Sequence, residues 1–167
     1  MARDNMERII STLEKENKIY RELLSLSNEK KDYILEGKVK EIDKIVQIES
    51  SLIIEISKLE KVREATVQAL AEGYGLPQEN LTVSYISEKI KDPRSKILAE
   101  ITDSISKTLV DLKEINDTNG KLLEQSLEYI NFSVNLINSS LEPQNGVYEA
   151  KTGETTGEKR SLFDAKV

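Results

Sequence analysis

Carboxylates are the side chains in this sequence that could do acid–base or metal chemistry. The chain has 30 Asp and Glu but no His and no Cys, which excludes imidazole catalysis, phosphorelay through His, thiol nucleophiles, disulfides and His/Cys zinc sites. A di-metal site in a helix bundle needs Glu-x-x-His motifs, which this chain cannot supply. The sequence also lacks a glycine-rich phosphate loop and a G-x-S-x-G motif. We therefore expect no enzyme, no metal site and no cofactor.

The glutamates of the first two predicted helices fit a structural role. They are expected on solvated faces or as partners of Lys four residues away, and the set is Glu7, Glu14, Glu16, Glu22, Glu41, Glu49, Glu55, Glu60 and Glu64. Glu49 and Arg63 also fall on an apolar seam, two heptads apart. Charges there are costly unless they pair across helices. We expect interhelical polar pairs that fix the packing register rather than catalysis.

Reversible apolar binding is the other chemistry that the sequence indicates. Residues 129–141 read YINFSVNLINSSL and carry no charge, although 32% of the chain is Asp, Glu, Lys or Arg. Their apolar members are Tyr129, Ile130, Phe132, Val134, Leu136, Ile137 and Leu141. A solvated helix face normally keeps Lys and Glu. The segment is therefore expected either to meet an apolar partner or to complete an internal helix bundle.

The bulk composition excludes several partners. At 167 residues, the chain is expected to form one domain, or one elongated unit with a tail. A net charge of −6 without a clustered basic patch argues against nucleic acid. No run approaches the roughly 18 apolar residues of a membrane span, and the opening MARDNMERII lacks the apolar core of a signal peptide. We expect a cytoplasmic protein with no membrane span.

Three long helices are predicted because apolar residues recur at alternating steps of four and three; they cover about residues 3–35, 38–72 and 93–141. Gly37 ends the first helix. The second ends at the Gly- and Pro-containing start of a connector over 73–92, which has room for one or two helical turns over 83–90. Asp92-Pro93 is a start signal for the last helix.

The expected seams define the fold. They are Met6, Ile10, Leu13, Asn17, Tyr20, Leu24, Ser27, Lys31 and Ile34; then Val39, Ile42, Val46, Glu49, Leu52, Ile56, Leu59, Arg63, Thr66 and Leu70; and finally Leu98, Ile101, Ile105, Thr108, Leu112, Ile115, Asn119, Leu122, Ser126, Tyr129, Ser133 and Leu136. Long helices joined by loops predict an all-α fold. It is expected to be an elongated antiparallel bundle of three long helices with coiled-coil character over 1–141.

Two stretches of the last helix are ambiguous. Residues 116–120 (NDTNG) look locally like a turn, but the heptad phase continues through them, so one continuous helix is favoured. Within 129–141, apolar residues alternate with Asn and Ser as in a strand. Helix is favoured there as well, because the upstream phase continues. The low helix propensity of Asn, Ser and β-branched residues predicts a weak end that a partner would order.

The last residues differ in composition. Residues 142–167 hold three of the seven Gly and only scattered apolar side chains, so a flexible tail is expected. Leu162 and Phe163 form an apolar pair within it. This pair is either a docking motif or an accident of composition.

The order of these elements resembles the FlgN-type flagellar export chaperones, which are chaperones of hook-associated proteins. The resemblance covers nearly the whole chain. It rests on a long first helix, a second helix with an early Glu and a late L-E-x-x-R, and a last helix with N-x-x-N-x-x-L-L-x-x-S-L-x-Y-I. Here these are Glu49, Leu59-Glu60-Lys61-Val62-Arg63, and Asn116, Asn119, Leu122, Leu123, Ser126, Leu127, Tyr129 and Ile130, followed in the tail by Tyr148, Gly153 and Leu162-Phe163-Asp164.

The resemblance implies a concrete function. Members of the family bind hook-associated proteins of the hook–filament junction, prevent their premature assembly and deliver them to the type III export gate and its ATPase. Their C-terminal helix engages the C-terminal helical region of the client. Carried over to this chain, client binding falls on Leu123, Tyr129, Ile130, Phe132, Val134, Ile137 and Leu141, an apolar set able to join an amphipathic helix.

Two other classes stay open from the residues alone. A structural coiled-coil adaptor or spacer would have the same seams but no exchangeable client, and it would bury residues 129–141 in its own dimer. A regulatory helical bundle of the receptor or phosphotransfer kind is the other class. The absence of His argues against phosphotransfer, and nothing marks a ligand pocket.

Overall fold

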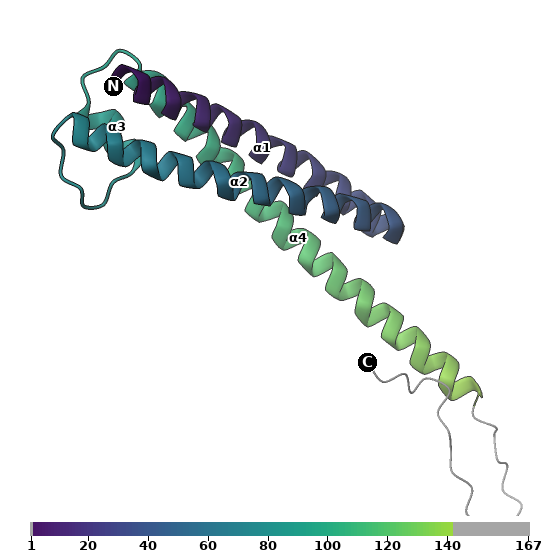
Figure 1. Cartoon of the computed structure of the whole chain (residues 1–167). Coiled ribbons are helices and arrows are strands. Elements are labelled where there is room, and N and C mark those ends of the chain that lie inside the picture. Colours follow the sequence, from purple (N-terminus) through teal and green to yellow (C-terminus); the bar gives the residue numbers. More distant parts are fainter. Residues whose placement is uncertain (1, 142–167) are drawn as a thin grey trace, which may run out of the picture. The chain divides into compact units, whose positions relative to one another are not determined.

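The computed structural model describes residues 2–141, and side chains within 4–140. This range is all-α, as predicted, with helices α1 (Ala2–Glu36), α2 (Val39–Gly73), α3 (Val83–Lys89) and α4 (Ser95–Leu141) (Figure 1). The predicted count of three helices is corrected by the short α3, which forms within the connector where one or two turns were expected. The coiled-coil character stays a prediction. The tail over 142–167 lies outside the described residues.

The chain divides into two units between Ile130 and Asn131. The first unit contains α1, α2, α3 and the part of α4 up to Ile130. The second begins at Asn131 and contains the rest of α4. The helix α4 is unbroken through residues 116–120 and through 129–141, so the helical interpretation of both ambiguous stretches is confirmed.

Two glycines end the long helices of the hairpin. Gly37 has φ +68°, a left-handed conformation that suits Gly. Next to it, the N–H of Lys38 donates to the carbonyl of Tyr33 at 2.9 Å, which closes the last turn of α1. Gly75 has φ +65°, and the N–H of Leu76 donates to the carbonyl of Ala71 at 2.8 Å. The turn at Gly37 brings α2 back along α1 (Figure 1).

Cross-helix side-chain contacts fix the directions of the helices in the first unit. Between α1 and α2, Glu16 pairs with Arg63 and Lys30 pairs with Glu49, so these helices are antiparallel. Between α1 and α4, Asn17 bonds Ser104, and Ser27 accepts a bond from Asn119, so these two run in the same direction. The arrangement is therefore up, down, up, with α1 in contact with both other long helices.

The core of the first unit has two apolar clusters. The larger one joins all four helices and consists of Met6, Ile9, Leu13, Val67, Leu70, Ala71, Ile86, Ile90, Leu98 and Ile105. The smaller one consists of Ile19, Leu23 and Ile56. Ile86 of α3 is fully buried in the larger cluster, and Thr82 caps that helix by accepting the N–H of Tyr85 at 3.1 Å. The connector thus closes one end of the bundle.

The buried faces differ in part from the predicted seams. In α1, Met6, Leu13, Ser27 and Ile34 are buried as predicted. Ile9, Glu16 and Leu23 are buried as well, more deeply than the predicted Ile10, Asn17 and Leu24. Because α1 packs against two helices, two adjacent rows of its side chains face inward. In α2, the prediction is wrong for Val39 and Val46, which are 73% and 44% exposed.

A buried ion pair links α1 to α2 in the middle of the bundle. Glu16 was predicted on a solvated face or as a partner of Lys four residues away, but it is fully buried, and its Oε2 lies 3.0 Å from Nη1 of Arg63. Its Oε1 has no hydrogen-bond partner among the described atoms. Desolvation raises the pKa of the Glu16 carboxyl, and the charge and hydrogen bond of Arg63 oppose that effect. The guanidinium of Arg63 therefore stabilises the negative charge of the buried Glu16 carboxylate.

Candidate partner-binding surface

A polar layer marks the end of the buried part of α4. Asn119 is 3% exposed and its Nδ2 donates to the carbonyl of Ser27 at 2.8 Å. The hydroxyl of Ser27 lies 3.2 Å from Glu49 Oε1, and Lys30 Nζ lies 2.7 Å from Glu49 Oε2. The prediction that Glu49 and Arg63 each pair with a residue of another helix is thus confirmed: Glu49 pairs with Lys30, and Arg63 pairs with Glu16. Such polar contacts fix which turns of the three helices face each other.

Beyond this layer, α4 exposes apolar side chains in the first unit. Leu123, Tyr129 and Ile130, three of the predicted binding residues, are 40%, 72% and 54% exposed. Leu127, which sequence reasoning did not include, is 60% exposed. It lies four residues after Leu123 and three before Ile130, so all three share one helix face. That heptad spacing was the signal by which Leu127 could have been found.

The second unit continues the uncharged sequence of α4. Phe132, Val134 and Ile137 are 62%, 43% and 59% exposed. Leu136, which was not in the predicted set, is 50% exposed. Leu141 is helical, but its side chain lies outside the described residues, as do Leu162 and Phe163. The described part of this segment therefore presents apolar side chains to solvent rather than to a core.

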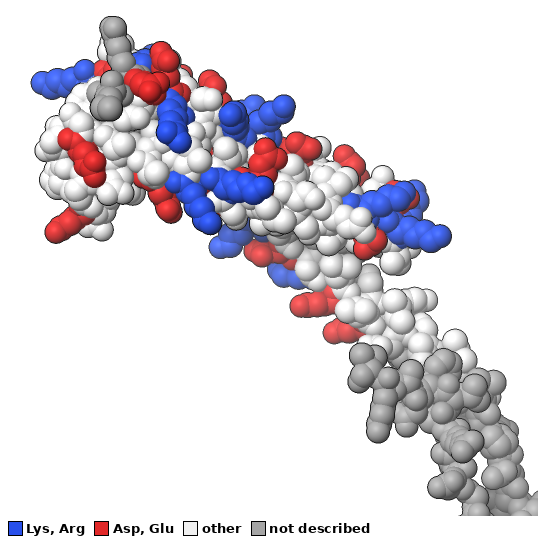
Figure 2. Space-filling view, viewed as in Figure 1, with Lys and Arg blue, Asp and Glu red and all other residues white. Residues whose placement is uncertain are grey.

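The uncharged segment of α4 differs from the rest of the surface in its charge. Lys, Arg, Asp and Glu side chains are mixed over α1 and α2 on the face seen in Figure 2, whereas the visible part of α4 next to the grey atoms is white. Exposed apolar side chains next to a charged surface are typical of sites that bind other proteins. Among residues 2–141, no three His, Cys, Asp or Glu side chains gather in a way that could hold a metal ion.

The tip of the α1–α2 hairpin also contributes apolar surface within the first unit. A hollow of about 510 Å³ lies between Ile34, Leu35 and Gly37 on the hairpin and Leu122, Tyr129 and Ile130 on α4. Leu35 is 62% exposed. The hairpin tip was not predicted as part of the site, because from the sequence Leu35 was only the last apolar residue before a helix end.

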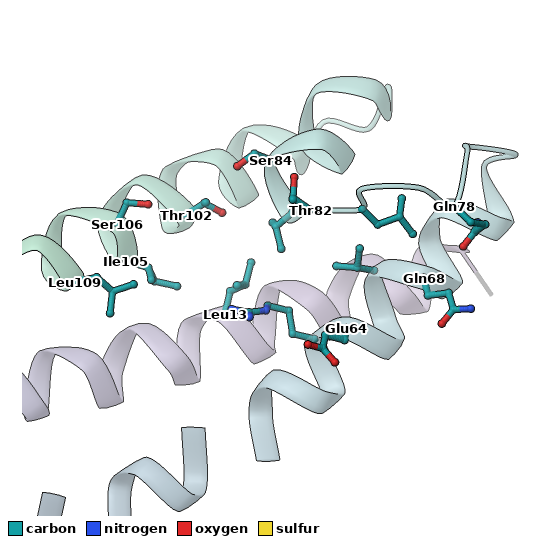
Figure 3. Close-up of a pocket in the computed structure, with 14 residues that line it drawn as sticks. Leu13, Glu64, Gln68, Gln78, Thr82, Ser84, Thr102, Ile105, Ser106 and Leu109 are labelled. Atoms are coloured by element: carbon teal, nitrogen blue, oxygen red, sulfur yellow. The ribbon is translucent and has the colours of Figure 1, made fainter. Parts of the chain in front are cut away.

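Another hollow of the first unit contains none of the predicted site residues. Figure 3 shows this cleft of about 750 Å³, which is lined by α2, α4, Leu13 of α1 and the segment over 78–84. Its polar side chains are the amides of Gln68 and Gln78, several Ser and Thr hydroxyls, and Glu64 beside Arg63. These groups can donate and accept hydrogen bonds, but the lining includes no paired nucleophile and base.

Within residues 2–141, the structure has no helix whose length and apolar character would let it cross a membrane. This finding concerns the described helices only.

Comparison with known proteins places these features in a family. The family described as "FlgN protein" matches residues 1–156, which includes the whole bundle and the exposed segment of α4. The uncharacterized protein YvyG of Bacillus subtilis (strain 168) is 30% identical over 158 residues, which cover 95% of this chain and 96% of that protein. No solved structure matches the chain. The match covers every described residue and confirms the resemblance: the chain belongs to the FlgN family of flagellar export chaperones.

Proposed function

We propose that this protein is a cytoplasmic chaperone of hook-associated flagellar proteins. It binds the C-terminal helical regions of these clients, prevents their premature assembly and delivers them to the type III export gate and its ATPase. The observation that carries the proposal is the exposed, uncharged segment of α4, in which Phe132 and Ile137 are 62% and 59% exposed. The function needs no catalysis and no cofactor.

The proposed binding residues are Leu123, Tyr129, Ile130, Phe132, Val134, Ile137 and Leu141. An amphipathic client helix would otherwise expose its own apolar stripe and self-associate. The chaperone packs its own apolar helix face on that stripe and so prevents self-association of the client. The contact is noncovalent, so it can dissociate when the client is delivered. Leu162 and Phe163 stay a predicted docking motif, with the export machinery as the proposed target.

The direct test is complex formation between the full chain and purified hook-associated proteins of the same bacterium. Size-exclusion chromatography with light scattering should show a discrete complex, and the client without its C-terminal helical region should not bind. An obligate dimer of this chain that ignores every such client would instead favour the structural adaptor.

Amide hydrogen exchange should detect the effect of the client on α4. In the free chain, residues 129–140 have no buried side chains, and Asn, Ser and β-branched residues hold the helix weakly. We expect fast exchange there and slow exchange over 98–119, which pack on the core. Adding a hook-associated client should slow exchange over 129–140. Slow exchange in that segment of a client-free monomer would show that it is ordinary core.

A further inference from the structure

An apolar groove runs between α2 and α4 within the first unit. It has a volume of about 520 Å³ and is walled by Ile42, Val46 and Ile53 on one side and by Leu112, Gly120 and Leu123 on the other. Val46, Ile53 and Leu123 are 44%, 56% and 40% exposed. These side chains face a hollow that α1, α2 and α4 leave uncovered.

Both walls of the groove have the spacing that a packed helix requires. On α2, Ile42, Val46, Glu49 and Ile53 line it, and on α4 Leu112, Asn116, Asn119 and Leu123 line it. The three polar members, Glu49, Asn116 and Asn119, are hydrogen-bonded to Ser27 of α1, which also lines the groove. Both series have steps of four, three and four, the spacing of residues that receive a neighbouring helix. The two matched series each span 12 residues, or about 17 Å at 1.5 Å per residue, and Ile56 extends the α2 wall by three residues more. The groove therefore has the length of about three helical turns, and a fourth helix would complete a four-helix bundle.

The α4 edge of the groove carries two acidic residues and one basic residue, the exposed Lys113, which lies three residues before the lining Asn116. Gly120 lines the groove, and the exposed Asp117 and Glu124 lie three residues before and four after Gly120 on the same helix face. On α2, the exposed Asp43 lies three residues before Val46. An incoming helix with Lys or Arg beside its apolar stripe would complement these carboxylates. A second copy of this chain, with a net charge of −6, would bring like charges together.

The remaining chain is a poor occupant. Pro143, Gly146, Gly153 and Gly157 interrupt residues 142–167. The ten residues after Gly157, EKRSLFDAKV, are fewer than the residues that either wall spans. The groove thus fits a longer, regularly patterned helix from another protein.

We propose that this groove seats a helix of the client, flanked by basic residues, so that α2 forms a second wall of the binding site opposite α4. The inference rests on the proposed function and extends it to Ile42, Val46 and Ile53. Client recognition then depends on the bundle itself as well as on the uncharged end of α4.

Gly120 allows a sharp test. A Cβ built on Gly120 meets no atom within 4 Å, and any residue except Pro favours a helix more than Gly does. Gly120→Trp should therefore fold at least as stably as the natural chain while it fills the groove. With fluorescent peptides of the C-terminal helical regions of hook-associated proteins as probes, we expect full-length Gly120→Trp to bind about 30-fold more weakly or worse. Lys121→Trp, at the next and exposed position outside the groove, should bind normally.

Two adjacent isoleucines on α2 give a second matched pair. Ile53 and Ile54 are 56% and 59% exposed, but only Ile53 lines the groove. Ile53→Asp should weaken peptide binding and Ile54→Asp should not. Glu124→Lys should weaken binding as well and reduce its dependence on salt.

The outcomes separate this inference from the proposed function. If Phe132→Asp abolishes peptide binding but Gly120→Trp and Ile53→Asp do not, the chain binds clients without this groove and the inference is wrong. If no variant changes binding, the proposed site on α4 fails with it. If Gly120→Trp leaves client-peptide binding unchanged but speeds amide exchange over residues 142–167 in the client-free full chain, the chain's own tail occupies the groove and the inference is wrong.

Discussion

Phe132→Asp and Ile137→Asp should each abolish client binding and leave the melting temperature almost unchanged. Both side chains are more than half exposed, so a carboxylate there stays hydrated in the free protein. In a complex, the same carboxylate would be buried against an apolar client helix without a partner, which adds its desolvation cost to the lost apolar contact. Burial of one such side chain contributes about 1.5–3 kcal/mol. We expect affinity to fall by about 100-fold or more, as measured by titration calorimetry.

Ile105→Asp is the matched control on the same helix. Ile105 is 7% exposed and belongs to the larger core cluster, and it lines the same hollow as Leu13, so the same carboxylate would be placed in the apolar core. We expect this variant to lose its cooperative thermal transition. If Phe132→Asp unfolds the protein as Ile105→Asp does, then residues 129–140 are core, and the chaperone function rests on family membership alone.

The long helices could be predicted from the sequence because local signals agree there. Gly37 separates two heptad patterns, and it adopts the left-handed conformation that only Gly accepts readily. The phase of α4 passes through 116–120, and the helix is unbroken there. Asp92 acts near the predicted start of α4 by accepting the N–H of Arg94 at 2.8 Å, although the helix begins at Ser95. In each case neighbouring residues alone determine the outcome.

The charged part of the core could not be predicted, because it depends on contacts between distant residues. Glu16 resembles its solvated neighbours in the sequence, and nothing near it marks burial. It is buried because Arg63, 47 residues away, faces it across the α1–α2 contact. An apolar pattern also assumes one buried row per helix, whereas α1 turns two rows inward. The exposed groove wall on α2 was missed for the opposite reason: Val46 lies on the predicted apolar seam, so the sequence pattern predicts that it is buried, although it is 44% exposed.

The sequence predicts where on the chain the candidate site lies, but not which other helices contribute to it. The loss of all charge over 129–141 is visible in the sequence, and the described side chains there are exposed or half-buried. The hairpin tip with Leu35 and the α2 wall come close to α4 only through folding. A sequence pattern therefore identifies the helix that offers the apolar face, but not the other helices that complete the surface.

Arg63→Leu should destabilise the protein strongly without changing client affinity. Removing Arg63 leaves Glu16, which is fully buried, without its partner, and an uncompensated buried charge costs about 3 kcal/mol or more. In a domain of this size the melting temperature should fall by roughly 6–12 °C. Lys61→Leu, which removes an exposed charge two residues earlier on α2, should change it by a degree or two at most. A large loss of affinity with unchanged melting would instead make Arg63 a binding residue.

The pH dependence gives the Arg63→Leu variant a distinctive signature. Burial already raises the pKa of Glu16 above its ordinary value of 4.5, and Arg63 holds it down. Without Arg63 the folded-state pKa rises further, so the folded state takes up a proton more readily than the unfolded chain. The free energy of unfolding of Arg63→Leu, relative to the natural chain, should therefore be lowest at neutral pH and recover as the pH falls toward 4.5.

Glu16→Leu combined with Arg63→Leu removes the titrating group. This double variant should regain most of the lost stability at pH 7 and show no such recovery in acid. If Arg63→Leu shows the same relative stability from pH 7.5 to pH 5, water reaches Glu16 in the folded state and the carboxylate is not a buried charge.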